Sequence, residues 1–111
     1  MAYDEGLAER LRDALEGRPG VSERKMFGGL AFMVRGNMAC GVSGEELIVR
    51  LPPDQYEAAL AEEDVRPFGM PGKRPMTGFA LVGGGEQLAD DASLGAWVER
   101  AVTHAGATRP K

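Results

Sequence analysis

The segment from Leu30 to Val42 constrains the fold of this chain more than any other part of the sequence. Its two apolar, β-prone runs are separated by Gly36-Asn37, a dipeptide typical of a two-residue hairpin because both residues tolerate positive φ. A tight turn at this dipeptide predicts that Met33 faces Cys40 across the hairpin. Both faces of the hairpin are then largely apolar, so we expect it to be central in its sheet or covered on both sides.

Apolar residues at helical spacing predict one helix near each end of the sequence. The first helix precedes Gly17, and its apolar stripe consists of Leu7, Leu11, Ala14 and Leu15. The last helix has the most regular stripe, formed by Leu94, Trp97, Val98, Ala101 and Val102. We expect Asp90, Asp91 or Ser93 to cap its start. Gly106 and Pro110 are expected to end it.

The remaining segments alternate between strands and one short helix. We expect that helix from about Asp54 to Glu62, since the preceding Pro52-Pro53 pair suits a first helical turn. Besides the hairpin, β-prone runs predict strands at Val21–Met26, Leu47–Leu51, Val65–Phe68 and Met76–Val82. A helix, a run of strands, a helix, further strands and a last helix argue for an α+β fold with an antiparallel sheet covered by helices.

Length and charge restrict the class of protein. The 111 residues fit a single domain, 1–111, large enough to bury one core. The net charge of −4 opposes nucleic-acid binding by the chain as a whole, because phosphate contacts need a basic surface. The single cysteine excludes an internal disulfide and fits a reducing compartment. With no signal-peptide pattern and no apolar run long enough to span a bilayer, we expect a cytoplasmic protein without membrane contact.

The residue types most often used in catalysis form no recognisable arrangement. Cys40 lies in the middle of a predicted strand, where a small buried residue is expected, and His104 lies at the end of the last helix. One cysteine and one histidine do not make a zinc site without several carboxylates. We therefore expect no catalytic residue, no metal, no cofactor and no enzyme activity. A small enzyme is the alternative if Cys40, Ser43 and His104 meet in one cleft.

The loop from Arg66 to Arg74 is the segment best suited to an interaction. It combines cations, an aromatic side chain and a backbone restricted by proline. Together with two cations earlier in the chain, it supplies the candidate interaction residues Arg24, Lys25, Arg66, Phe68, Lys73 and Arg74. Such residues can dock a protein or contact phosphates if they converge in space. The alternative is a solvated connection in which Phe68 anchors the loop to the core.

Several of these segments also carry a family resemblance. They are Arg24-Lys25-Met26-Phe27-Gly28-Gly29, the hairpin Leu30–Met38, Pro67-Phe68, Gly72-Lys73-Arg74-Pro75-Met76 and Leu94-Gly95-Ala96-Trp97. Together they resemble the N-terminal domain of the TfoX/Sxy family, which is associated with regulation of natural competence in bacteria. The resemblance covers about residues 3–105.

The resemblance implies a fold and the absence of a known active site. The implied fold is a two-layer α+β domain of the YjbR or type III secretion chaperone kind, in the order α-β-β-β-α-β-β-α. No catalytic residues of the family are implied. The competence regulators carry a second, C-terminal helical domain, for which this sequence has no room, so a standalone domain is expected.

Three functions follow as hypotheses. The first is a non-enzymatic regulatory or protein-interaction module with an unidentified protein partner, linked to transcriptional or competence-type regulation. The second is a nucleic-acid-associated factor that uses a local basic patch, and the third is a small enzyme. We also expect a homodimer, because six methionines and a sheet with two apolar faces suggest spare hydrophobic surface.

Overall fold

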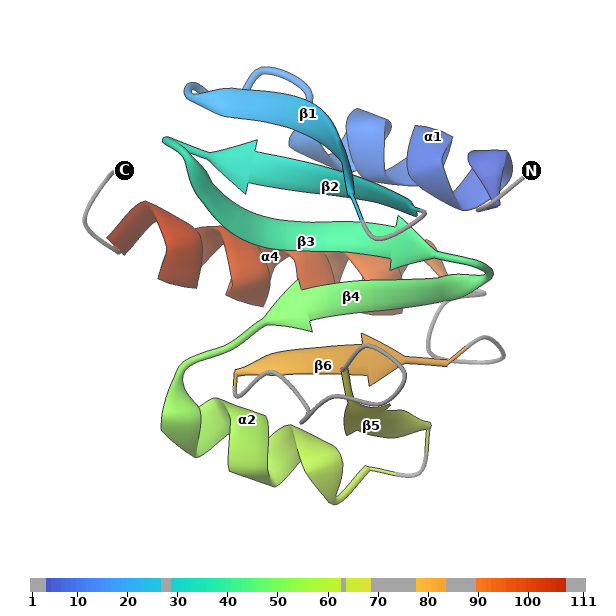
Figure 1. The fold of residues 1–111 in the computed structure, drawn as a ribbon, viewed down its shortest axis with the longest axis vertical. Coiled ribbons are helices and arrows are strands. Elements are labelled where there is room, and N and C mark those ends of the chain that lie inside the picture. Colours follow the sequence, from blue (N-terminus) through green and yellow to red (C-terminus); the bar gives the residue numbers. More distant parts are fainter. Residues whose placement is uncertain (1–3, 27–28, 63, 69–77, 84–89, 108–111) are drawn as a thin grey trace.

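The computed structural model describes residues 4–26, 29–62, 64–68, 78–83 and 90–107 (Figure 1). In chain order its elements are α1 (Glu5–Leu15), β1 (Val21–Met26), β2 (Gly29–Val34), β3 (Asn37–Ser43), β4 (Glu46–Arg50), α2 (Pro53–Leu60), β5 (Val65–Pro67), β6 (Phe79–Val82) and α4 (Asp91–Ala107). The predicted alternation of helices and strand runs is confirmed. The first run contains four strands, because Val21–Met26 pairs with the hairpin as well.

The described strands form one antiparallel sheet of six strands in the order β1-β2-β3-β4-β6-β5. The last two strands are inverted relative to the chain, since β6 pairs with β4 and leaves β5 at the edge (Figure 1). The hairpin of β2 and β3 therefore lies inside the sheet, as predicted. The α+β class with an antiparallel sheet is also confirmed.

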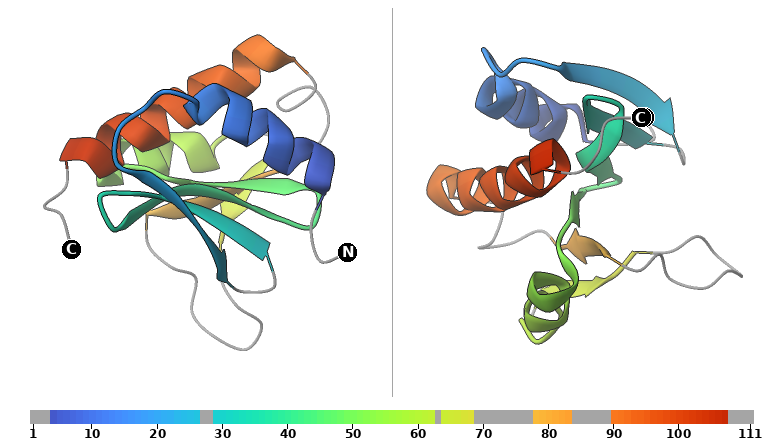
Figure 2. Two further views of the ribbon diagram at one scale, coloured as in Figure 1. Left: turned by 90° about the horizontal axis from the view of Figure 1, so that it is seen from above. Right: turned by 90° about the vertical axis from the view of Figure 1, so that its left-hand side faces the viewer.

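The described helices pack against one face of the sheet, which we call the helical face. Figure 2 shows α1 and α4 side by side over it, and α2 contributes Tyr56 and Ala59 to the same core. Because residues opposite each other in adjacent strands share a face, the register defines a row across the sheet on this side. It runs through Lys25, Leu30, Val42, Leu47, Val82 and Val65, and all but the lysine are buried in the main core.

The opposite face of the sheet, which we call the distal face, carries a second apolar cluster. Its buried members are Ala31, Met33, Met38, Ile48 and Phe68, with Phe79 and Leu81 half-buried against them. None of the described helices contributes to this cluster. The prediction of a hairpin with two apolar faces is therefore confirmed.

The turn of the β2–β3 hairpin differs from the prediction. Its two central residues are Arg35 and Gly36, with φ of 53° and 86°, and Asn37 is already the first residue of β3. Two successive positive φ values are what a type I′ turn requires, and its twist matches that of the flanking strands. The predicted turn at Gly36-Asn37 is thus wrong by one residue, and Asn37 is buried at 2% exposure.

A β-bulge changes the pairing further along the same hairpin. Met33 pairs with Met38, but the next pair is Phe32 with Cys40, so Ala39 is the extra residue. The predicted pairing of Met33 with Cys40 is therefore wrong. As a result Cys40 lies on the helical face with Phe32, whereas Met33 lies on the distal face.

The caps explain where the first and last helices begin. Asp4 accepts hydrogen bonds from the backbone N–H groups of Gly6 (2.8 Å) and Leu7 (3.2 Å) at the start of α1. Asp90, one of the three predicted caps, accepts from the N–H of Ala92 (3.3 Å) at the start of α4. The helix ends at Ala107, directly after Gly106, and Pro110 lies outside the described residues. Among the described helices, none is long and apolar enough to cross a membrane.

Candidate interaction surface

The predicted interaction residues of the described part lie on both faces and both edges of the sheet. A second row crosses all six strands on the distal face through Arg24, Ala31, Gly41, Ile48, Leu81 and Arg66. This row is apolar in its centre and has an arginine at each end. Lys25 alternates to the helical face, although it directly follows Arg24 in the sequence.

The two arginines of this row do not converge. Five strand spacings of about 4.8 Å place Arg24 and Arg66 roughly 24 Å apart across the sheet. Arg66 also forms an ion pair with Glu46 of β4, which offsets its charge. Lys73 and Arg74 lie outside the described residues. Within the described part of the chain, the predicted cations therefore form no single basic cluster.

Phe68 anchors the end of β5 to the sheet. Its side chain is 5% exposed in the distal cluster, and its backbone N–H donates to the carbonyl of Phe79 (2.9 Å). This is the anchoring role that the alternative interpretation of the loop expected. A buried Phe68 contributes to packing of the domain and is not itself a contact surface for a partner.

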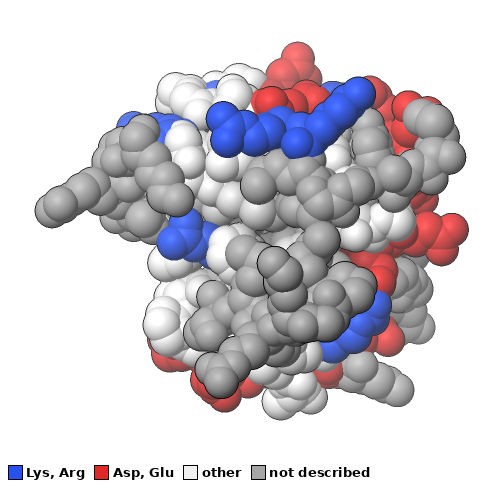
Figure 3. Space-filling model, viewed as in Figure 1, with Lys and Arg blue, Asp and Glu red and all other residues white. Residues whose placement is uncertain are grey.

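The distal face nevertheless offers apolar and cationic groups to solvent. Phe79 and Leu81 of β6 are only half-buried, and the guanidinium of Arg50 lies 5.7 Å from the centre of the Phe79 ring. Arg24 is exposed at the β1 edge of this face. Figure 3 looks onto the distal face and shows Lys and Arg side chains along that edge.

The three residues that a small enzyme would need are not arranged together. Cys40 is fully buried in the main core, and burial raises the pKa of its thiol to about 12. Ser43 pairs with Glu46, the first residue of β4. Arg50 is the last residue of β4, and its charge contributes to lowering the pKa of His104. The described residues contain no group of three or more His, Cys, Asp or Glu side chains that could hold a metal ion.

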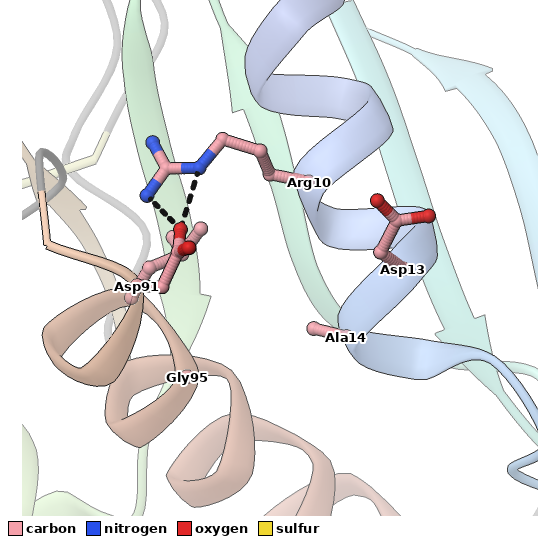
Figure 4. A pocket seen from close by; sticks show the side chains of 6 residues that line it. Arg10, Asp13, Ala14, Asp91 and Gly95 are labelled. Atoms are coloured by element: carbon pink, nitrogen blue, oxygen red, sulfur yellow. Dashed lines mark hydrogen bonds and ion pairs between the residues drawn. The ribbon is translucent and has the colours of Figure 1, made fainter.

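A hollow of about 340 Å³ between α1 and α4 is occupied at its rim by an ion pair (Figure 4). Arg10 reaches across from α1 and donates to Oδ1 of Asp91 through Nε (3.2 Å) and Nη2 (2.8 Å). Arg18 and Glu99 form a second ion pair between the N-terminal part of the chain and α4. These charges fasten the two helices to each other, so the hollow is best explained as part of the helix packing.

Arg12 joins α1 to the edge strand in the same way. Its guanidinium donates to Glu9 of the same helix. It also makes a bidentate contact with the carboxylate of Glu23 in β1, at 2.8 and 2.9 Å. These hydrogen bonds raise the pKa of Arg12 and lower the pKa of Glu23. Both residues act as a structural connection between helix and sheet.

A second hollow, of about 370 Å³, lies between α2 and α4. It is lined by Pro52, Gln55, Glu99, Arg100, Thr103 and His104. His104 is partly buried there, and burial followed by the nearby charge of Arg50 lowers the pKa of its imidazole. This hollow was not predicted from the sequence, where His104 was considered without its neighbours in space. The signal that could have found it is the spacing of Arg100 and His104, which places both on one face of a helix.

The chain matches the family model described as the TfoX N-terminal domain over residues 13–105. This chain belongs to the TfoX N-terminal domain family. The family is of a regulatory, competence type. No functionally curated protein and no solved structure matches the chain.

The TfoX N-terminal domain match covers the complete six-stranded sheet and the residues of the α2–α4 hollow. The ion pair of Arg10 with Asp91 has its first member outside the matched range. Both rows across the sheet lie entirely inside it. The distal face and the α2–α4 hollow are therefore features of the family domain in this chain.

Proposed function

We propose that this TfoX N-terminal domain is a regulatory module that binds a protein partner with the distal face of its sheet and catalyses no reaction. The observation that carries the proposal is the accessible part of the distal face, where Phe79 and Leu81 are half-buried and Arg24 and Arg50 carry positive charge, while the centre of the row is buried. The described helices cover the other face. Because the family is of a regulatory, competence type, we assign this binding to regulation of that type.

The distal face favours a partner with apolar side chains flanked by carboxylates. Phe79 and Leu81 supply half-buried apolar surface, while Arg24 and Arg50 supply positive charge. Among the described residues, neither Arg24 nor Arg50 forms an ion pair with a carboxylate. Charge complementarity of this kind selects the partner and accelerates association more than it increases affinity.

The proposed absence of catalysis is supported by the burial and the raised pKa of Cys40, the single cysteine of the sequence. A nucleophilic cysteine needs exposure and a lowered pKa, and Cys40 has neither. His104 and Ser43 lie toward opposite ends of β4, so neither can activate the other. Ion pairs of the described polar side chains join α1 to α4, α1 to β1 and β5 to β4, which are structural connections.

Two neighbouring residues of β1 provide a matched test. Arg24 and Lys25 are both exposed and adjacent, but they point to opposite faces of the sheet. Affinity capture from a lysate of the source organism, followed by mass spectrometry, compares the unmodified protein with Arg24→Glu and Lys25→Glu. We expect Arg24→Glu to lose the partner and Lys25→Glu to keep it. A partner that is retained by both variants, or lost equally from both, contradicts binding through the distal face.

The nucleic-acid hypothesis is the alternative that the sequence left open. It has less support because Arg24 and Arg66 are far apart and Arg66 is paired with Glu46. An electrophoretic mobility shift across a salt series decides between the two, since phosphate contacts are strongest at low salt. Binding of duplex DNA at low salt that weakens with Arg24→Glu would favour this alternative over a protein partner.

A further inference from the structure

We propose that the hollow between α2 and α4 binds a small phosphate-bearing anion through the guanidinium of Arg100. This site is separate from the distal face and goes beyond the proposed function. The hollow is lined from both helices and has a volume of about 370 Å³, within the range of small-molecule sites. Its lining combines hydrogen-bond donors with positive charge, in a chain whose net charge is −4.

Arg100 is held in a fixed position at this hollow. Its guanidinium lies over the Trp97 ring at 4.6 Å from the ring centre, and its Nε donates to Oε1 of Gln55 across from α2 (3.3 Å). The contact to Gln55 uses one N–H of the guanidinium fork. In the described structure the remaining N–H groups of Arg100 contact no carboxylate. A planar guanidinium held in this way is well suited to two oxygens of one phosphate group.

The charges around Arg100 favour an anion. Glu99 also lines the hollow, but its carboxylate is paired with Arg18, which offsets its charge. Arg50 lies close enough for its positive charge to lower the pKa of His104, although burial is the larger cause of that shift. The balance of charge at the hollow is therefore positive.

The remaining lining groups suit the other oxygens of a phosphate. Thr103 presents a hydroxyl group one turn along α4 from Arg100, and the imidazole of His104 lies beside it. On the opposite side, α2 starts at this hollow without a side-chain cap at Pro52, so the positive end of its helix dipole adds to the potential set by the arginines. Cations are disfavoured by the same groups.

Trp97 provides a direct readout, because it is the only tryptophan and its ring lies against Arg100. Sodium phosphate is titrated into the protein at constant ionic strength with chloride, and tryptophan fluorescence is recorded. We expect a saturable change at millimolar phosphate. Arg100→Gln should raise the Kd roughly tenfold or more, since it removes a charge-assisted, two-pronged contact.

Arg10→Gln is the matched control. Arg10 also lines an interhelical hollow and loses the same charge on substitution, but its hollow lies between α1 and α4. We expect its Kd for phosphate to stay within about twofold of the unmodified protein, because Arg10 does not line the α2–α4 hollow and its charge is already paired with Asp91. A non-saturable titration, or an equal loss of affinity in both variants, overturns the proposal.

Two further measurements keep the test decisive if Arg100→Gln does not fold. Arg100→Lys preserves the charge but not the planar fork, so we expect it to bind phosphate more weakly than the unmodified protein. In amide NMR spectra of the unmodified protein, phosphate should shift Gln55, Thr103 and His104 together. Shifts located elsewhere contradict the site, and succinate binding at the same residues as tightly as phosphate contradicts the ligand class.

Discussion

The two faces of the sheet are built from alternate residues of the same strands, yet they differ in composition and in what covers them. On the helical face the central row is made of leucine and valine and is buried beneath the helices. On the distal face the corresponding row contains alanine and glycine in its centre, and flexible methionines lie beside it. Branched side chains fix one packing arrangement, whereas methionine adapts to different neighbours. The helical face therefore holds the larger and more rigid part of the core, and the distal face holds a smaller cluster with half-buried members.

Among the substitutions that test the two faces, the largest loss of stability is expected from Gly41→Ala, at the centre of the distal row. A Cβ atom at Gly41 would lie 2.6 Å from the carbonyl oxygen of Leu30, and a backbone oxygen cannot move aside easily. We expect a loss of about 3 kcal/mol in the free energy of unfolding, or failure to fold. Gly95→Ala on α4 is the control, because its Cβ meets nothing within 4 Å, and a gain of up to about 1 kcal/mol is expected there. Chemical denaturation measures both, and equal stability of Gly41→Ala would refute the close approach.

A pair of leucines on adjacent strands tests the difference between the faces directly. Leu47 of β4 is fully buried on the helical face, whereas Leu81 of β6 is half-buried on the distal face. We expect Leu47→Ala to lower the free energy of unfolding by about 3 kcal/mol, through lost burial and the cavity left behind. Leu81→Ala should lower it by about 1 kcal/mol, because solvent fills the space. Equal losses in urea denaturation would show that the distal face is as closely packed as the helical face.

Cys40 on the helical face is expected to make the free energy of unfolding depend on pH. Burial raises the pKa of this thiol from 9.0 to about 12, so above pH 9 the unfolded chain loses the proton while the folded chain keeps it. Stability from this group is therefore fully present below pH 9 and declines by up to about 1.4 kcal/mol per pH unit between pH 9 and 12. Cys40→Ala should remove this part of the decline. If denaturation curves of the two proteins fall in parallel with pH, the thiol is not buried as described.

The smallest effect is expected at the ion pair between α1 and β1. Arg12 and Glu23 are partly exposed, so solvent screens their attraction, and Glu23→Gln should cost about 0.5 kcal/mol at low salt. The pKa of Glu23 is lowered by Arg12, so this contribution is present above the unfolded pKa and is lost as pH falls through the folded pKa. Added salt should reduce the difference between the two proteins. A difference that persists at high salt would show that the pair is more buried than its exposure indicates.

Hydrophobic periodicity predicted the elements well because it depends only on local sequence. The stripe ending in Val102 and the cap at Asp90 both lie where the sequence placed them. The hairpin register was not predictable in the same way. Arg35 adopts a positive φ that its residue type does not favour, and the bulge at Ala39 has no glycine or proline to mark it in the sequence.

The candidate surface was predictable only in part. Successive side chains of a strand point to opposite faces, so Arg24 and Lys25 lie on different faces of the sheet. Their separation was predictable from the sequence once β1 was assigned. The inverted order of β6 and β5 could not, and it is this order that places Arg66 at the edge opposite Arg24. The hollow at Arg100 was missed for a related reason, since it depends on how α2 and α4 pack against each other.

The position of α4 has a consequence for how the protein is made. This helix covers the centre of the helical face, but it follows every described strand in the chain (Figure 2). All six described strands are therefore synthesised before the helix that buries their leucines and valines. The core of the helical face is completed only when the last element of the chain packs against it, so this face cannot reach its full burial while the chain is still growing.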